Sequence, residues 1–312
     1  MREIISIVVP CYEEEEVLEC FYNRMIKVLE DLDRYYRINS ELIFIDDGSK
    51  DKTFELIKSF YHDKIKMAYI SFSRNFGKEA AMIAGLKKST GEYVAVIDAD
   101  LQDPPELLIK MVDRVLHGKC DCVAARRVSR KGEPFLKTIF SKVFYKLINV
   151  LSNTEIVDGA RDFRLMTRKM VEAVIEVKEY NRFSKGIFSW IGFETQWVDY
   201  ENCERVAGKS KWSLKKLFKY SVDGIISYST VPLALASLIG LLFCLIAFIM
   251  ICVIIVKTLI WGDPVAGYPS MICVIFLIGG IQLFCMGILG QYLSKIYMEV
   301  KNRPLYIIKE ES

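Results

Sequence analysis

The stretch Tyr93–Asp103, YVAVIDADLQD, decides the fold class, because a short apolar run ends abruptly in a cluster of carboxylates. Further apolar runs occur at Ile4–Val9, Leu42–Ile45, Met67–Phe72 and Cys120–Ala124, and stretches with helical periodicity separate them. Short strands that alternate with helices are typical of an α/β fold. The sequence therefore predicts a mostly parallel sheet covered by helices.

Polar clusters follow four of these apolar runs at the point where each run ends. They are Pro10–Glu14, Asp46–Ser49, Ser73–Lys78 and Asp98–Asp103. Ligands bind at the carboxyl edge of such sheets, so we expect the four clusters to meet in space. One acidic turn after a strand is often only a helix N-cap, and this alternative applies to the second cluster taken alone.

The Asp98-Ala99-Asp100 sequence carries the predicted chemistry. Two carboxylates at this spacing can face one hard cation, Mg²⁺ or Mn²⁺, that also holds the diphosphate of a nucleotide sugar. The cation would act as a Lewis acid on the departing diphosphate. Other nucleotide motifs are missing from the sequence: no G-x-G-x-x-G follows the first run, and Cys203 stands where a P-loop needs its leading glycine.

Two long apolar segments lie near the C-terminus. Val231–Val256 contains no charged residue, and Met271–Ser294 is also uncharged. Each exceeds the roughly 20 residues that cross a bilayer core, so a transmembrane hairpin is predicted. Lysines flank the hairpin on its outer sides, which places the active site and both termini in the cytoplasm of a multi-pass plasma-membrane protein.

The composition excludes several other classes. The start of the chain, MREIISIVVPCYEEEE, has a short apolar run followed by four acids, so it does not resemble a signal peptide. The nine cysteines show no zinc spacing. The net charge is only +3 and no basic recognition helix is present, so nucleic acid is not an expected partner.

Six motifs make the chain recognisable: VVPCYEEEE, FIDDGSKDKT, SFSRNFGKEAAMIAGL, DADLQDPPE, DFRLM and GKSKWS. With these motifs in this order, the chain resembles glycosyltransferase family 2. The resemblance is to its dolichol-phosphate mannose synthase and bacterial polyprenyl-phosphate (bactoprenol) glucosyltransferase branch. The resemblance implies a GT-A type, Rossmann-like nucleotide-sugar domain at residues 1–210. It is followed by an amphipathic juxtamembrane helix at 211–229, two transmembrane helices within 230–296 (about 231–256 and 271–294) and a cytoplasmic tail at 297–312.

The resemblance also implies roles for individual residues. The nucleotide-sugar site would contain Pro10, Tyr12, Glu14, Asp46, Asp47, Lys78 and Asp98. The metal ligands would be Asp98, Asp100 and Gln102. Phosphate groups of the donor or acceptor would face Arg126, Arg205, Ser210 and Lys211. The family usually has Asn at the position of Glu13, so Glu13 is left out of the site.

The predicted reaction is inverting. An acceptor phosphate is already anionic at neutral pH, so it needs positioning more than deprotonation. The catalytic candidates are Asp100, Asp162 and Asp158, and Asp162 is preferred over Asp158 because it lies in the matched DFRLM. Its carboxylate would orient a hydroxyl or stabilise positive charge on the sugar ring. The alternative is a structural ion pair with Arg161 or Arg164.

The sequence thus predicts transfer of one sugar, glucose from UDP-glucose, to undecaprenyl phosphate. UDP-N-acetylglucosamine, another UDP-sugar and GDP-mannose remain open as donors. A processive polysaccharide synthase is disfavoured because no Q-x-x-R-W follows DFRLM, and an inactive membrane-tethered binding protein is disfavoured by the intact Asp98, Asp100 and Gln102. Small residues in the hairpin are compatible with a homotetramer.

Overall fold

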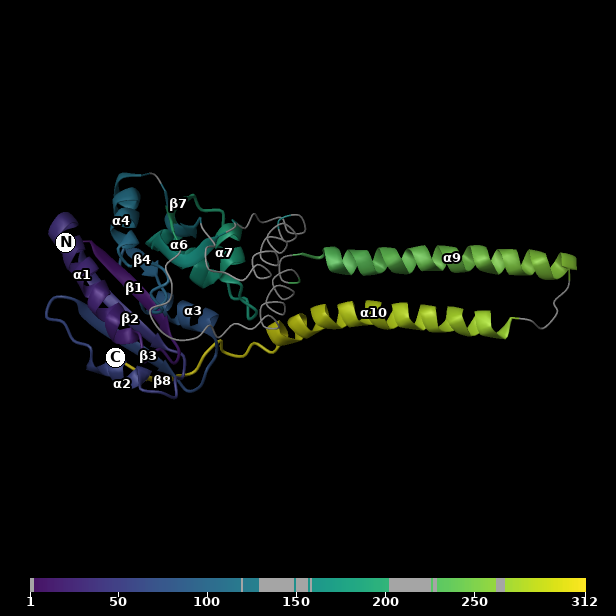
Figure 1. Ribbon diagram of the computed structural model, residues 1–312, viewed down its shortest axis with the longest axis horizontal. Helices are drawn as coiled ribbons and strands as arrows, with labels where there is room; N and C mark the ends of the chain where they lie inside the picture. Colours follow the sequence, from purple (N-terminus) through teal and green to yellow (C-terminus); the bar gives the residue numbers. More distant parts are fainter. Residues whose placement is uncertain are drawn as a thin grey trace.

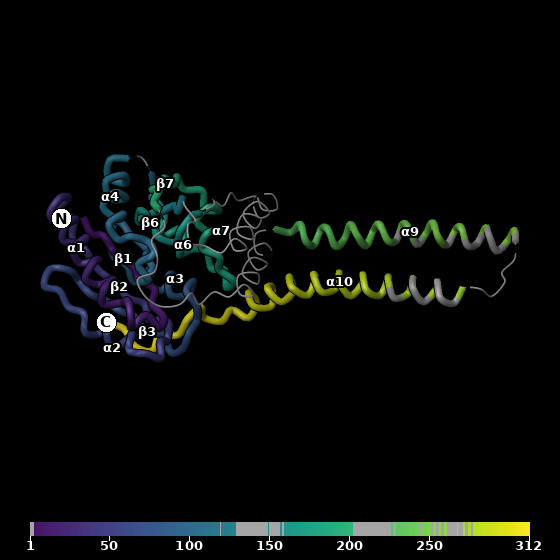
Figure 2. The backbone as a smooth tube through the Cα atoms, viewed as in Figure 1, coloured from purple at the N-terminus to yellow at the C-terminus, as the bar shows by residue number. Residues whose placement is uncertain are grey.

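A two-helix hairpin projects from an α/β domain in the computed structural model (Figure 1). The structure describes residues 3–118, 120–128, 149, 157, 159–201, 226, 229–261 and 267–312. Both ends of the chain lie in the α/β domain, so the chain leaves through α9 and returns through α10 (Figure 2).

The described part of the chain contains eight strands in one sheet. The strands are β1 (Ile4–Cys11), β2 (Asn39–Asp46), β3 (Lys66–Phe72), β4 (Tyr93–Val96), β5 (Cys122–Arg127), β6 (Ala160–Thr167), β7 (Thr195–Tyr200) and β8 (Ile308–Glu311). The helices are α1 (Leu18–Tyr36), α2 (Thr53–Ser59), α3 (Lys78–Lys88), α4 (Leu107–His117), α6 (Arg168–Glu176), α7 (Ser184–Trp190), α9 (Val231–Trp261) and α10 (Tyr268–Val300). All five predicted strands are present with small shifts at their ends.

The strand order is β7-β5-β6-β4-β1-β2-β3-β8. β1 pairs in parallel with β2 and β4, and β3 pairs in parallel with β2. β6 runs antiparallel between β4 and β5, and β8 runs antiparallel to β3. The mostly parallel α/β sheet is therefore confirmed, and the carboxyl ends of β1 to β4 share one edge.

Helices cover both faces of the sheet. Successive residues of a strand point to opposite faces, so Ile7 packs with the cluster that contains Phe21 of α1 and Met111 of α4. Val8 packs with the cluster that contains Ala81 of α3 and Met170 of α6. Because both faces are buried at the centre of the sheet, β1 and β4 are apolar at nearly every position.

The hairpin helices are longer than predicted. α9 and α10 contain 31 and 33 residues, and at 1.5 Å per residue each is well over the roughly 30 Å of a bilayer core. The stretches Val231–Met250 and Leu277–Val300 are long and apolar enough to cross a membrane. Large apolar side chains are exposed along them: Phe248 is 68% exposed and Leu283 is 72% exposed.

The base of the hairpin is joined to the α/β domain. The Tyr292 hydroxyl donates to the Ser229 carbonyl oxygen at 2.6 Å, which ties α10 to the segment before α9. A Glu299 carboxylate oxygen accepts the Tyr180 backbone N–H at 2.8 Å. The predicted juxtamembrane helix at 211–229 lies outside the described residues, except for positions 226 and 229.

Candidate functional site

A cavity of about 480 Å³ lies at the carboxyl ends of β1, β2 and β3. Its lining includes Tyr12, Asp46, Gly48, Phe54, Arg74 and Lys309. Tyr12 and Asp46 belong to the predicted nucleotide-sugar residues, and Arg74 belongs to the polar cluster after β3. The structure therefore brings three of the four strand-end clusters to one cavity. Pro10 is buried near the end of β1, and the Glu14 backbone N–H donates to the Thr53 hydroxyl at 2.8 Å just beyond it.

The two acids at the end of β2 hold the cavity walls together. The buried Asp46 carboxylate accepts the Ser49 backbone N–H at 3.0 Å and the Ser71 hydroxyl at 2.7 Å. The Asp47 carboxylate accepts the backbone N–H groups of Phe76 and Gly77 at 2.6 and 2.9 Å. Burial raises the pKa of Asp47 to about 6, although both N–H groups oppose the rise.

Gly48 is required by a close approach of two loops. Its φ is +68°, which side-chain-bearing residues rarely adopt. A Cβ built on Gly48 would lie 2.4 Å from the carbonyl carbon of Arg74, which is backbone and has little room to move. The glycine therefore lets the loop after β3 close over the loop after β2.

A lysine joins the ends of β4 and β6. The Lys78 ammonium, at the start of α3, donates to Asp98 Oδ2 at 2.8 Å and also to Asp162 Oδ2. Burial opposes the charge on Lys78, but the carboxylates of Asp162 and Asp98 outweigh it and raise the lysine pKa. Burial likewise opposes the charge on Asp162, but Lys78 and Lys185 lower its pKa, so this carboxyl stays ionised.

The turn after β4 has a strained backbone. Leu101 has a φ of +57° and is 2% exposed, so a buried leucine occupies the left-handed region. Asp100 Oδ1 accepts the Gln102 backbone N–H at 3.1 Å across this turn. Strain of this kind persists where surrounding contacts enforce it, and it clusters at functional sites.

A triad of polar side chains that no sequence motif indicated lies next to this turn. The Asp103 carboxylate accepts Arg161 Nε at 2.9 Å and also accepts the Tyr200 hydroxyl. Arg161 Nη2 reaches Gln102 Oε1 at 3.4 Å. Arg161, one of the proposed ion-pair partners of Asp162, thus pairs with Asp103, and Asp162 pairs with Lys78. The three members come from distant parts of the chain, so spacing alone did not reveal them.

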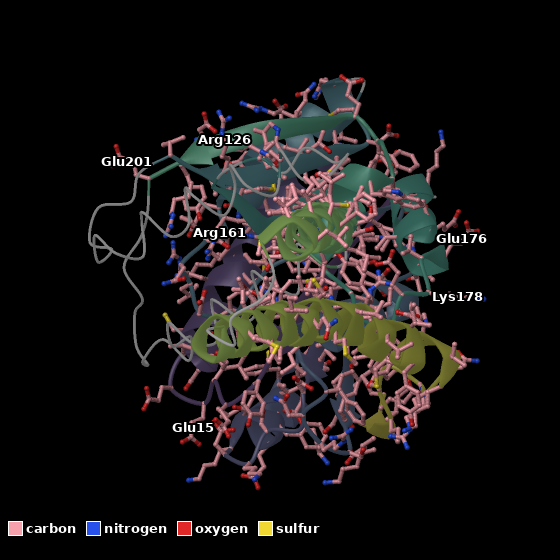
Figure 3. All side chains as sticks on the ribbon, turned by 90° about the vertical axis from the view of Figure 1, so that its right-hand side faces the viewer. Glu15, Arg126, Arg161, Glu176, Lys178 and Glu201 are labelled. Carbon is pink, nitrogen blue, oxygen red and sulfur yellow. The ribbon has the colours of Figure 1, made fainter. Side chains whose placement is uncertain are left out.

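Arg126, a predicted phosphate ligand, forms a two-pronged ion pair. Its Nε and Nη2 donate to the two carboxylate oxygens of Asp199 at 2.7 and 2.8 Å. In a view along the hairpin, Arg126 and Arg161 lie on the same flank as Glu201, which follows β7 (Figure 3). A phosphate bound by Arg126 would have to compete with Asp199.

Four other predicted site residues lie outside the described residues: Asp158, Arg205, Ser210 and Lys211. Among the described residues, no three His, Cys, Asp or Glu side chains form a metal-binding group. Asp98 and Asp100 supply two carboxylates to the turn after β4, at the sheet edge. Such a set suits Mg²⁺ or Mn²⁺, whose remaining positions are commonly filled by substrate phosphates and water. Asp98 is already paired with the Lys78 ammonium, so a divalent cation at this turn would have to share the Asp98 carboxylate with the lysine.

Comparisons with known proteins agree with the α/β fold. Residues 6–175 match the family described as "Glycosyl transferase family 2". The chain is 42% identical to "Putative glycosyltransferase CsbB" of Bacillus subtilis (strain 168), over 98% of this chain and 92% of that protein. It is 43% identical to "Bactoprenol glucosyl transferase" of Shigella phage SfII, over 98% of this chain and 97% of that protein.

A solved structure with a similar chain is glucosyl-3-phosphoglycerate synthase from Mycobacterium tuberculosis, in complex with Mn²⁺, UDP-glucose and phosphoglyceric acid. The sequence identity is 20%, the TM-score is 0.46, and the match covers 72% of this chain and 78% of that chain.

Proposed function

Because the chain belongs to glycosyl transferase family 2, we propose that it transfers one glucose from UDP-glucose to undecaprenyl phosphate at the cytoplasmic face of a membrane. The observation that carries this proposal is the carboxylate turn after β4, directly beside the strand ends that form the cavity. The name "Bactoprenol glucosyl transferase" of a relative that matches nearly the whole chain supports both the sugar and the polyprenyl acceptor.

The cavity and the turn fit the two halves of a nucleotide sugar. The base and ribose would occupy the cavity beside Tyr12 and Asp46, and the diphosphate would extend toward Asp98 and Asp100. These two carboxylates, with Gln102, would hold Mg²⁺ or Mn²⁺. A bound divalent cation would neutralise the charge that develops on the leaving diphosphate.

The residues around Asp162 would position the sugar. An oxygen of the acceptor phosphate attacks the anomeric carbon, the bond from that carbon to the diphosphate breaks, and the nucleoside diphosphate leaves with the bonding electrons. No proton has to be removed from the ionised acceptor phosphate. Asp162, kept ionised by Lys78, would orient a sugar hydroxyl or stabilise positive charge on the ring. Asp100 would act through the cation.

The hairpin would bring the site to its lipid acceptor. Its exposed apolar side chains would lie in the bilayer, and both ends of the chain would remain with the catalytic domain in the cytoplasm. Polyprenyl phosphate carries its phosphate at the membrane surface, so a domain held at the base of the hairpin meets the acceptor there. The homotetramer proposed from the small residues of the hairpin would be measured by the mass of the detergent-solubilised protein.

Lipid-linked product is the readout that tests this function. The purified full-length protein is incubated with undecaprenyl phosphate, Mg²⁺ and each of four donors: UDP-glucose, UDP-N-acetylglucosamine, UDP-galactose and GDP-mannose. We expect one sugar per lipid, with UDP-glucose as the best donor. Asp100→Ala should abolish transfer, whereas Asp113→Ala, which changes an exposed acid on α4, should retain it.

Each alternative function predicts a different product. A processive synthase would add several sugars, and an inactive binding protein would consume no donor. Either result would contradict the proposal. Near-normal transfer by Asp100→Ala would reject the assignment of the cation site.

A further inference from the structure

We infer that the C-terminal strand β8 is part of the donor site and that Lys309 on this strand donates a hydrogen bond to a carbonyl oxygen of the nucleotide base. This inference rests on the proposed function, since it assumes that the cavity binds a nucleotide. It adds a residue from beyond the hairpin to a site otherwise built by the N-terminal half of the chain.

β8 is firmly joined to the edge of the sheet. It pairs with β3 at Ile70–Glu311 and Ser71–Glu310, and the Ser73 backbone N–H donates to the Ile307 carbonyl oxygen at 3.0 Å. Just before the strand, the Tyr306 ring stacks on Phe72 with centroids 4.9 Å apart. The segment that follows α10 thus has a defined place in the domain.

Ion pairs on β8 involve two different helices. Glu310 accepts from Lys58 of α2 at 2.8 Å, and Glu311 accepts from Lys88 of α3 at 3.0 Å. Exposed pairs of this kind contribute little energy singly. Together with the strand pairing, they fix the register of β8 and therefore the position of Lys309 between its neighbours.

A β-bulge sets Lys309 apart from the rest of the strand. Ser71 pairs with Glu310, but the next residue, Phe72, pairs with Ile308, so Lys309 is the extra residue between two paired positions. Bulges redirect a side chain and often occur next to active sites. Lys309 lines the cavity together with Tyr12 and Asp46.

The sheet order shows which part of the donor Lys309 would meet. β8 is the outermost strand, three strands beyond β1, whereas the Asp98–Asp100 turn follows β4 on the other side of β1. The diphosphate belongs at that turn, so the far end of the cavity is left for the base. An ammonium only donates hydrogen bonds, so its partner must be an acceptor such as a uracil carbonyl oxygen.

This arrangement links donor binding to the membrane hairpin. Residues 301–307 are all that separate α10 from β8. A bound nucleotide that contacts Lys309 stabilises the pairing of β8 with β3, and the pairing of β8 with β3 in turn holds Lys309 at the cavity. We therefore expect UDP to slow amide hydrogen exchange in residues 305–312.

The test measures equilibrium binding of UDP, with Mg²⁺ present, to the full-length protein in detergent. Lys309→Met keeps the aliphatic stem and removes the donor, so we expect roughly tenfold weaker binding of UDP. Lys301→Met, which changes a lysine of the same C-terminal segment that contacts Tyr297, should bind UDP like the wild type. ADP, whose base has no carbonyl group, should bind the wild type and Lys309→Met equally.

Each outcome separates the inference from the proposed function. If the wild type binds UDP and Lys309→Met binds it equally well, or if the slowing of exchange by UDP persists in that variant, the role of Lys309 is refuted and the proposed function stands. If Lys309→Met weakens UDP and ADP alike, the lysine contacts phosphate and the assignment to the base is refuted. A wild type that binds no UDP overturns both.

Discussion

Replacement of Lys78 by methionine removes the positive charge that joins Asp98 to Asp162. The two carboxylates would then lie at the sheet edge without the ammonium that joins them, and Lys185 would be left to act on Asp162 alone. We expect the variant to be less stable than the wild type without divalent cations, and we expect Mg²⁺ to recover more stability in the variant than in the wild type. The reason is that a cation held by Asp98 and Asp100 would restore positive charge next to Asp98, where the ammonium has been lost.

The exposure of the three side chains sets the size of the effect. Loss of one partner from a fully buried pair costs about 3–5 kcal/mol, whereas an exposed pair contributes about 0.2–1 kcal/mol. The side chains of Lys78, Asp98 and Asp162 are 38%, 23% and 20% exposed, which lies between these limits. We expect a loss of about 2 kcal/mol, or about 4–8 °C in melting temperature for a domain of this size.

The assay is thermal unfolding of the detergent-solubilised protein in EDTA and in millimolar Mg²⁺. Lys88→Met is the matched control, because Lys88 lies on the same helix and forms one surface ion pair, with Glu311. Its loss should cost less than about 1 kcal/mol and should not depend on Mg²⁺. Lys78→Arg should melt close to the wild type. If Lys78→Met melts like Lys88→Met, or if Mg²⁺ shifts the variant and the wild type equally, the reasoning is wrong.

Three further predictions concern the loops around the cavity. The pKa of Asp47 is raised from 3.8 to about 6, so the protonated carboxyl stabilises the fold fully below about pH 4, and this stabilisation is lost as the pH rises through about 6. Asp47→Asn should remove this pH-dependent change, on the order of 3 kcal/mol, from the free energy of unfolding. An unchanged pH profile in the variant would contradict the prediction. Gly48→Ala should weaken UDP binding at least tenfold, because the new Cβ meets the backbone of Arg74 and pushes the two loops of the cavity apart. Normal UDP affinity would show that the loops can separate without harm to the site. Glu13→Asn should raise the melting temperature by about 1–4 °C, since Glu13 has a φ of +50° that Asn tolerates better. A lower melting temperature would mean that the contacts of the Glu13 side chain stabilise the fold by more than the relief of backbone strain.

The elements with strong local signals were predictable. The apolar runs that lead to Asp46 and Asp98 were recognisable as strands, because both faces of the sheet are buried and its carboxyl edge is polar. The two long helices were predictable as well, since an uncharged run of this length favours a helix that could cross a bilayer.

The contacts that depend on distant parts of the chain were not predictable. β8 is four residues long and carries three charged residues, so its sequence gives no strand signal, and only pairing with β3 defines it. The residues assigned to a tail at 297–312 instead contain the end of α10 and this strand. The Asp103–Arg161–Tyr200 triad and the lysine bridge to Asp162 likewise arise from tertiary packing.

Incorporation of radiolabelled glucose into lipid is the measurement that tests the central claim most directly. The full-length protein is given labelled UDP-glucose with undecaprenyl phosphate in detergent, and the label in the organic phase is counted with Mg²⁺, after EDTA treatment and after Mg²⁺ is restored. We predict label in the organic phase only when both the lipid and the cation are present, with recovery on restoration. Full transfer under exhaustive chelation, or no labelled lipid under any condition, would contradict the account.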